Sequence, residues 1–530
     1  MTMKTAKVLV SDKLSEGGLD VLKRADCVDV DYKPGLSEDQ LAEIIGDYDG
    51  LIIRSGSKVS EKVLNQAARL RVVGRAGIGV DNVDVPVASR RGVVVMNTPT
   101  GNAVTTAEHA ISLLMSLARR IPQATASMRA GKWEKSKFQG REIAGKTLGV
   151  VGMGNIGRIV ADRAQGLKMR VVAFDPVLSA ERAASLGVTL VELDELFARA
   201  DFITVHAPLT PQTKGLIGPD TFPKMKKGVM IINAARGGIV DEAGLAVALR
   251  EGQVAGAALD VFSEEPVAKD HPLLELDNVV LTPHLGASTS EAQERVALEI
   301  CEQVVDFLQT GTIRNAVNVT SLDGEAAEQL RPFQHLAHTL GRLLSQLESV
   351  HVSEVRVTCS GEASEHGVRP IANVALAGYL ERFIETPVNS ISAPYRAKER
   401  GISVVEVRAD SFDRYRSSVS VTVTGKEGSH TAIGTLGSAG EALLVGFDDY
   451  VLNATLEGAM LAIYNEDKPG VIGGVGTVLG AAGINVSRMQ VGLSSARALS
   501  LWNIEEEPDE QVVAKLTSLP HIDTVKPIKL

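Results

Sequence analysis

A histidine, a glutamate and an arginine stand in the segments that follow three apolar stretches of this chain. His284 follows VVLTP, Glu265 lies in FSEEP, and Arg236 lies in NAARGG. Imidazole has a pKa near neutrality, so it both accepts and donates protons, and a neighbouring carboxylate stabilises its protonated form. A guanidinium binds a carboxylate through two parallel hydrogen bonds. Together the three residue types predict proton transfer on a small organic acid.

A glycine turn of the form G-x-G-x-x-G occurs at Gly152, Gly154 and Gly157, between an apolar stretch and a helical one. Glycine permits a tight turn and the close approach of a pyrophosphate, to which the helix N-terminus offers N–H groups. Asp175 stands behind a second apolar stretch, where it is placed to accept hydrogen bonds from a ribose and to repel a 2′-phosphate. The segment therefore predicts binding of NAD rather than NADP.

A dinucleotide, a proton-transferring pair and a carboxylate-binding arginine together specify hydride transfer at a 2-hydroxy-acid carbon. Two more arginines, Arg54 in LIIRSGSKV and Arg75 in VGRAGIG, suit a substrate that carries a phosphate as well as a carboxylate. The alternative is that these two arginines only form surface ion pairs. The residues that we expect to bind substrate in this region are Arg54, Ser55, Arg75, Gly77 and Asn102.

The segments NAARGGIVDE, AALDVFSEEP and TPHLGASTSEAQ resemble the signature blocks of the D-isomer-specific 2-hydroxyacid dehydrogenases, over about residues 5–320. The resemblance implies that His284 is the acid/base, that Glu265 is its partner and that Arg236 binds the substrate carboxylate. It also implies NAD contacts at Asn155, Ile156, Asp175, Ala234, Ala235, Arg236, Asp260, His284, Leu285, Gly286 and Ala287.

The N-terminal blocks are similar to the branch of this family that oxidises 3-phosphoglycerate, the first step of phosphorylated L-serine synthesis. The loop GKWEKSKFQG resembles a substrate loop of that branch, with Lys135 where arginine is common, which implies a point charge there rather than a guanidinium. Two other functions remain open. One is reduction or oxidation of another acid, such as glyoxylate or 2-hydroxyglutarate, and the other is a non-catalytic NAD-sensing scaffold.

Two α/β units, each a doubly wound parallel sheet with helices on both faces, must position these residues. The first has Ser11 and Asp12 where a nucleotide-binding sheet would have its glycine turn. In the second, strands run into polar or glycine-rich loops, which meet in one cleft beyond the carboxyl ends of the strands. A helix over 290–308 then returns the chain to the first unit. The predicted strands are residues 7–11, 50–54, 70–75, 93–97, 202–205, 229–233, 257–261 and 279–282.

The α/β pattern of alternating strands and helices ends at about residue 320. Apolar residues alternate with polar ones at 355–359 and 419–423, and TGKEGS at 424–429 is typical of a hairpin turn. Residues 387–402 are similar to the intervening domain of the long form of the family. From about 456, a strand, a helix over 471–482 and further strands predict a βαββαβ module.

This last module resembles an ACT domain, a small regulatory unit that binds amino acids, often between paired copies. The resemblance implies L-serine as an effector, bound through Asn465, Asp467 and Asn485 in and after the loop that ends at Gly470. The alternative is that this end of the chain only dimerises. We expect a homotetramer or a homodimer.

Four domains are therefore expected: a substrate-binding domain at 1–100 and 288–319, an inserted NAD-binding Rossmann domain at 101–287, an intervening α+β domain at 320–455 and an ACT domain at 456–530. The net charge of −10 without a basic tract argues against nucleic acid as a partner. No apolar stretch is long enough to span a membrane. Three separated cysteines, with no CxxC or HExxH, indicate a cytoplasmic protein without disulfides or bound metal.

Overall fold

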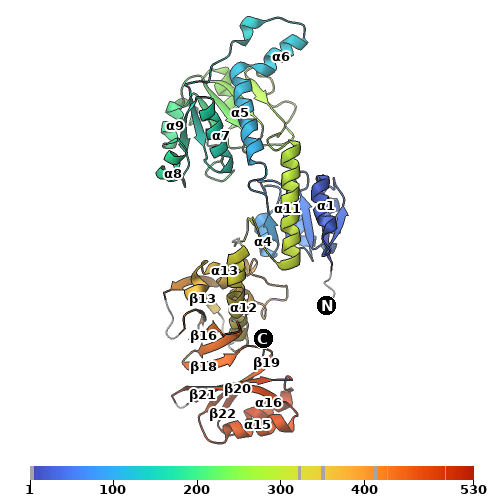
Figure 1. The fold of residues 1–530 in the computed structure, drawn as a ribbon, viewed down its shortest axis with the longest axis vertical. Helices are drawn as coiled ribbons and strands as arrows, with labels where there is room; N and C mark the ends of the chain where they lie inside the picture. The colour runs from blue at the N-terminus through green and yellow to red at the C-terminus, as the bar shows by residue number, and fades with distance from the viewer. Residues whose placement is uncertain (1–4, 320–323, 348–351, 411–414, 427, 496) are drawn as a thin grey trace.

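The computed structural model is an elongated arrangement of four β-sheets and their helices (Figure 1). It describes residues 5–319, 324–347, 352–410, 415–426, 428–495 and 497–530. The second sheet of the chain lies at one end of the molecule, the first lies next to it, and the third and fourth follow toward the other end. Two parallel sheets followed by a mixed and an antiparallel one confirm the predicted fold class.

The first sheet is parallel and has the strand order β2-β1-β3-β4-β5. Helices α2, α3 and α4 cover one face, while α1 and the late helix α11 cover the other. Both faces of the central strands are therefore buried, which explains their continuous apolar sequences. The elements are β1 Ala6–Val10, α1 Glu16–Arg24, β2 Val28–Tyr32, α2 Glu38–Ile44, β3 Gly50–Ile53, α3 Glu61–Gln66, β4 Val72–Arg75, α4 Val85–Arg90, β5 Val94–Met96 and α11 Ser290–Thr310.

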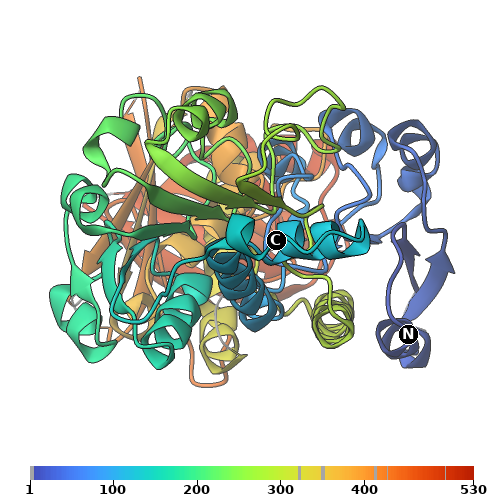
Figure 2. The same cartoon turned by 90° about the horizontal axis from the view of Figure 1, so that it is seen from above.

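The second sheet is parallel, with the order β12-β11-β10-β9-β6-β7-β8, so the chain reverses its direction of winding between β6 and β9. Such switch points are where ligands bind in open α/β sheets, and the glycine turn follows β6 directly. Figure 2 shows this unit, in green, beside the blue first unit. The elements are α5 Ala103–Arg119, α6 Ile121–Arg129, β6 Thr147–Val151, α7 Asn155–Gly166, β7 Arg170–Phe174, α8 Ala180–Ser185, β8 Thr189–Leu190, α9 Leu193–Arg199, β9 Phe202–Val205, β10 Val229–Asn233, α10 Glu242–Arg250, β11 Val254–Leu259 and β12 Val279–Leu281.

The third sheet is mixed, with the order β14-β13-β15-β16-β17-β18, and packs against α12 and α13. The predicted hairpin is confirmed, since Gly425 of β15 pairs with Gly428 of β16. The elements are α12 Gly324–Leu347, β13 Val352–Ser360, α13 Arg369–Leu380, α14 Ala393–Glu399, β14 Ser403–Ala409, β15 Ser418–Gly425, β16 Gly428–Leu436, β17 Ala442–Phe447 and β18 Tyr450–Thr455.

The fourth sheet is antiparallel, has the order β20-β21-β19-β22 and confirms the βαββαβ prediction. One of its faces joins the core of the third unit, because Met460, Leu499 and Ile528 are buried in the same apolar cluster as α12 and β13. The two C-terminal units therefore share a core. The elements are β19 Ala459–Glu466, α15 Val471–Ala481, β20 Val486–Ser494, β21 Arg497–Ile504, α16 Glu510–Thr517 and β22 Ile522–Lys529.

Three further observations bear on the class of protein. Among the described residues, no helix combines the length and apolar character that crossing a membrane requires. The same residues contain no group of three or more histidine, cysteine, aspartate or glutamate side chains arranged to hold a metal ion. Cys27, Cys301 and Cys359 are free thiols.

Candidate active site

A cavity of about 670 Å³ is lined by residues of both α/β units. The first unit supplies loops that follow β3 and β4, and the second supplies the segments that follow β11 and β12. This size is typical of a site for a small molecule or cofactor. The lining residues that the sequence predicted are Arg54, Ser55, Arg75, Gly77, Asn102, Glu265, His284 and Ala287.

His284 and Glu265 face each other at the second-unit side of this cavity. The distance from His284 Nδ1 to Glu265 Oε2 is 2.7 Å, and the other carboxylate oxygen accepts the backbone N–H of Phe262 at 3.0 Å. Because a carboxylate only accepts, Nδ1 carries the proton and Nε2 carries the lone pair. The pair is therefore set to take a proton at Nε2 and to stabilise the resulting imidazolium.

The segment that carries Glu265 is held from behind by Glu242, the first residue of α10. One carboxylate oxygen of Glu242 accepts the backbone N–H and the hydroxyl of Ser263, both at 2.7 Å. Its other oxygen lies 2.8 Å from His271 Nε2, and the His271 ring packs edge-on against Phe262. These contacts fix the orientation of the carboxylate that contacts His284.

Arg236 lies beside the cavity, in the loop after β10. Its Nε donates to Asp81 Oδ2 of the first unit at 2.8 Å, and its Nη1 donates to the carbonyl of Ala235 at 2.6 Å. The guanidinium also passes close to Gly79, where a Cβ atom would lie 1.8 Å from Nη2. Arg236 therefore connects the two units at the edge of the cavity, next to the arginines of the first unit.

Arg75 is the most buried charge of the cavity. Burial lowers the pKa of its guanidinium to about 10, and the nearby charges of Arg236 and Arg54 add to this effect. Arg75 Nε and the Oδ1 of Asn102 are buried without a hydrogen bond to any described residue. Buried polar atoms usually have partners, so the Arg75 Nε–H indicates a place for an anionic group and Asn102 Oδ1 a place for a group that donates a hydrogen bond, such as a hydroxyl.

The glycine turn has the geometry that a dinucleotide requires. Gly152 has a φ of +93°, which favours glycine, and a Cβ at Gly157 would lie 2.0 Å from the carbonyl oxygen of Gly152. A Cβ at Gly154 would meet nothing within 4 Å, so this side of the turn is open to a pyrophosphate. Helix α7 starts at the next residue, and the N–H groups of its first turn face the same place.

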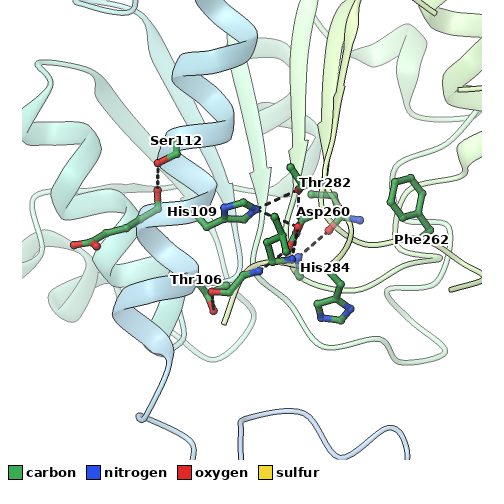
Figure 3. A network of polar contacts seen from close by, with 12 residues as sticks. Thr106, His109, Ser112, Asp260, Phe262, Thr282 and His284 are labelled. Carbon is green, nitrogen blue, oxygen red and sulfur yellow. Dashed lines mark hydrogen bonds and ion pairs between the residues drawn. The ribbon is translucent and has the colours of Figure 1, made fainter. Parts of the chain in front are cut away.

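The other residues predicted to contact NAD lie in or after elements of the same parallel sheet. Asp175 follows β7 and accepts the N–H groups of Met153 at 2.7 Å and Val177 at 2.9 Å, which holds its carboxylate at the turn. Asp260 is fully buried, and its carboxylate accepts hydrogen bonds from Thr282, Leu285 and Gly286, so it supports the 284–287 loop from behind (Figure 3). Asn155, Ile156, Ala234, Ala235, Leu285 and Gly286 lie at α7, after β10 and after β12.

Two groups of predicted site residues lie away from the cavity. Lys135 is exposed in the short 3-10 helix Lys135–Phe138, beyond α6, which projects from the end of the molecule (Figure 1). Asn465 is buried within β19, not in the loop after it as the sequence suggested, and its amide donates to the carbonyl of Glu466. Asp467 is exposed in that loop, and Asn485 donates to Glu505 at 3.0 Å.

Three polar residues that contact predicted site residues were not themselves predicted from the sequence. Asp81, in the GVDNVD segment, pairs with Arg236, and Asp12 accepts the backbone N–H of Arg54 at 2.6 Å. His109 of α5 lies 3.1 Å from Asp260. An acidic residue just after a strand is a usable signal for Asp12, whereas Asp81 lies six residues after β4 and His109 lies inside an amphipathic helix, so neither of these carries such a signal.

The comparisons with protein families match three parts of the chain. Residues 111–286 match the NAD-binding domain of the D-isomer-specific 2-hydroxyacid dehydrogenases. Residues 329–448 match the intervening domain of D-3-phosphoglycerate dehydrogenase, and residues 459–521 match the ACT domain. The unit with the glycine turn, the unit built on the third sheet and the unit built on the fourth sheet therefore each match a known domain family.

Solved structures similar to this chain cover its two α/β units. A Thermus thermophilus protein called TT0316 is 35% identical with a TM-score of 0.55, and the match covers 59% of this chain and 99% of that one. A D-lactate dehydrogenase from Aquifex aeolicus, solved with NAD and lactic acid, is 26% identical with a TM-score of 0.53, over 59% of this chain and all of that one. With the family match, this shows that the cofactor is NAD.

Curated relatives extend over the whole chain. A D-3-phosphoglycerate dehydrogenase of Synechocystis is 43% identical over 528 residues, which is 99% of this chain and 95% of that protein. The enzymes of the same name from Archaeoglobus fulgidus and Bacillus subtilis are 42% and 40% identical, over 97% and 99% of this chain and 98% and 99% of theirs. This chain, with its two α/β units, intervening domain and ACT domain, belongs to the D-3-phosphoglycerate dehydrogenase family.

Proposed function

We propose that this chain oxidises 3-phospho-D-glycerate to 3-phosphohydroxypyruvate, with NAD as the acceptor, at the start of phosphorylated L-serine synthesis. The observation that carries the proposal is the position of three guanidiniums, of Arg54, Arg75 and Arg236, around a cavity that also holds the His284–Glu265 pair. A substrate with both a carboxylate and a phosphate matches this concentration of positive charge. The name shared by the full-length relatives supports the same reaction.

The residues around the cavity each have a defined part in this reaction. Arg236 binds and orients the substrate carboxylate, while the first-unit arginines bind the phosphate. His284 Nε2 removes the proton of the C2 hydroxyl, and Glu265 stabilises the imidazolium through Nδ1–H. The glycine turn would hold NAD, which would supply the hydride acceptor for C2 when bound.

Closure of the two units is part of the proposed mechanism. The side chain of His284 is 49% exposed in this structure, so water has access to the reacting groups. Arg236 already spans the two units through its ion pair with Asp81. Movement of the units toward each other around a bound substrate excludes water and strengthens the electrostatic interactions within the cavity.

Substrate profiling tests the proposed function against its alternatives. We measure NADH oxidation with 3-phosphohydroxypyruvate, glyoxylate and 2-oxoglutarate under identical conditions. The phosphate contacts predict a kcat/KM at least about thirtyfold higher for the phosphorylated acid, since losing a paired buried charge costs roughly 2–5 kcal/mol. Equal values for the three acids would favour a broader dehydrogenase, and NADH binding without turnover would favour the scaffold.

The cofactor preference depends on the charge of Asp175. We expect Asp175→Asn, which keeps the size of the side chain, to raise kcat/KM with NADPH relative to NADH by roughly one to two orders of magnitude, because a carboxylate no longer repels the 2′-phosphate. Asp162→Asn is the matched control, since Asp162 lies on the exposed side of α7 and pairs with Arg163. An unchanged ratio in Asp175→Asn would remove this residue from cofactor discrimination.

L-serine is the effector in this proposal, and the ACT match at 459–521 supports it. The exposed loop between β19 and α15 carries Asp467, whose carboxylate suits the ammonium of an amino acid. We expect serine to inhibit the NADH-linked reaction and Asp467→Ala to raise the half-inhibitory concentration about tenfold, which corresponds to one lost charge-assisted hydrogen bond. Glu510→Ala, at the exposed start of α16, is the control and should leave inhibition unchanged.

A point substitution is preferable to removal of the C-terminal unit for this experiment. The shared core means that truncation near residue 455 would expose buried side chains of the intervening domain. Loss of inhibition in such a variant would not separate effector binding from damage to the fold. Unchanged inhibition in Asp467→Ala would place the effector elsewhere.

The assembly is a homodimer or homotetramer in this proposal, formed through the α6 end of the second unit. Ile121 and Met128 are about half exposed there, and Trp133 is 83% exposed. Large apolar side chains gathered at one projecting end are typical of a contact with another copy. Sedimentation of Trp133→Ser against the unmodified chain shows whether the substitution reduces the size of the assembly.

The free thiols are typical of a cytosolic protein, so we place this protein in the cytosol.

A further inference from the structure

The two α/β units are joined by two crossings of the chain, and both crossings lead to one buried carboxylate, Asp260. The first crossing leaves β5 and enters α5 at Ala103. The second leaves the His284 loop and enters α11, whose N-terminus is capped by Thr289. Any closure of the units turns about these two crossings. The contacts between them therefore decide where His284 lies when the units close.

Asp260 holds the His284 loop with both its side chain and its backbone. Its Oδ1 accepts the Thr282 hydroxyl at 2.6 Å and the Leu285 N–H at 2.7 Å, and its Oδ2 accepts the Gly286 N–H at 2.8 Å. Its backbone carbonyl accepts the His284 N–H at 2.9 Å. Figure 3 shows these bonds around His284. The loop therefore has its shape because this carboxylate is in place.

Helix α5 contacts the same loop through two residues one turn apart. His109 Nε2 lies 3.1 Å from Asp260 Oδ1 and 3.3 Å from the Thr282 hydroxyl oxygen, and its side chain is largely buried. Thr106 donates its hydroxyl to the carbonyl of Gly286 at 3.0 Å. Residues three apart lie on one helix face, so α5 presents both groups to the loop together (Figure 3).

The contact with His109 helps to stabilise the negative charge of the buried Asp260 carboxylate. Burial raises the pKa of this carboxyl, but hydrogen bonds from His109, from Thr282 and from the backbone of Leu285 outweigh burial and lower the pKa overall. Loss of one hydrogen-bond donor raises the free energy of a buried carboxylate. The loop is therefore expected to shift when the His109 donor is removed.

We propose that His109 is a positioning residue for the reaction: it acts through Asp260 to hold the His284 loop against α5, and so keeps His284 Nε2 aligned with the substrate hydroxyl during closure. The start of α5 supports this, because its N-cap residue Asn102 lines the cavity and its buried Oδ1 makes no hydrogen bond to the described residues. A ligand that binds Asn102 thereby acts on the helix that positions the catalytic loop. This inference rests on the proposed function.

Kinetics of three variants test the inference. We expect His109→Leu to lower kcat about ten- to hundredfold, because a displacement of about 1 Å at the reacting groups costs up to about a hundredfold, while KM for 3-phosphohydroxypyruvate stays within about threefold. His109→Gln places an amide N–H near the position of Nε2 and should recover kcat to within about threefold of the unmodified enzyme. Ser112→Ala, which removes only a bond from Ser112 to Glu108 within α5, should have no effect.

Hydrogen exchange gives a second readout that does not depend on turnover. The Leu285 and Gly286 amides, both bonded to Asp260, should exchange about tenfold faster in His109→Leu than in Ser112→Ala. Unchanged exchange at these amides would overturn the inference, as would equal losses of kcat in His109→Leu and His109→Gln. An inactive unmodified enzyme with the expected exchange pattern would instead overturn the proposed function and leave the structural role of His109 supported.

Discussion

We expect His284→Ala to lower kcat by about two to four orders of magnitude and to leave NADH affinity within about threefold. The reason is that the substitution removes the imidazole that we propose takes the hydroxyl proton, while the glycine turn, which we propose binds the pyrophosphate, is untouched. Steady-state NADH oxidation gives kcat, and titration of NADH binding gives the affinity.

A second histidine–carboxylate pair provides the matched control. His338 Nε2 lies 2.8 Å from Glu381 in the intervening domain, and this glutamate is about as exposed as Glu265. His338→Ala should therefore remove an equivalent pair and leave kcat unchanged. A His284→Ala enzyme that retains more than a tenth of the normal kcat would exclude His284 as the acid/base.

The second large effect is expected at Arg236. We expect Arg236→Lys to lower kcat/KM for the phosphorylated substrate by about two to three orders of magnitude, because lysine retains the charge but cannot bind a carboxylate through two parallel bonds. Lysine also cannot reproduce the Nε bond to Asp81, which joins the two units. The loss should appear in both kcat and KM, since orientation and binding are affected together.

Arg199 is the control for this substitution. It forms an exposed ion pair with Glu195 on α9, so Arg199→Lys should leave kcat/KM within experimental error. If Arg236→Lys retained a third or more of the normal kcat/KM, the carboxylate would have to be bound elsewhere. Arg75 would be the next candidate, because its Nε makes no hydrogen bond to any described residue.

Local sequence patterns predicted the strands that lead to the site. The predicted bounds of β9 and β10 agree with the structure, because a strand buried on both faces of a parallel sheet appears as an uninterrupted apolar run. Strand β2 and helix α1 were missed. The sequence VDVDY of β2 lies at the edge of its sheet with its aspartates toward solvent, so its apolar content is low.

The sequence by itself determined the chemistry: an imidazole and a carboxylate after successive strands, a glycine turn with an aspartate after the next strand, and three arginines at or after the ends of strands. Local spacing was enough because strand direction and turn geometry are set by neighbouring residues. The tertiary structure alone decided which groups meet. Asp81 pairs with Arg236 across 155 residues, and His109 meets Asp260 across a similar separation. Partners this far apart are chosen by the packing of whole units, which no local pattern encodes.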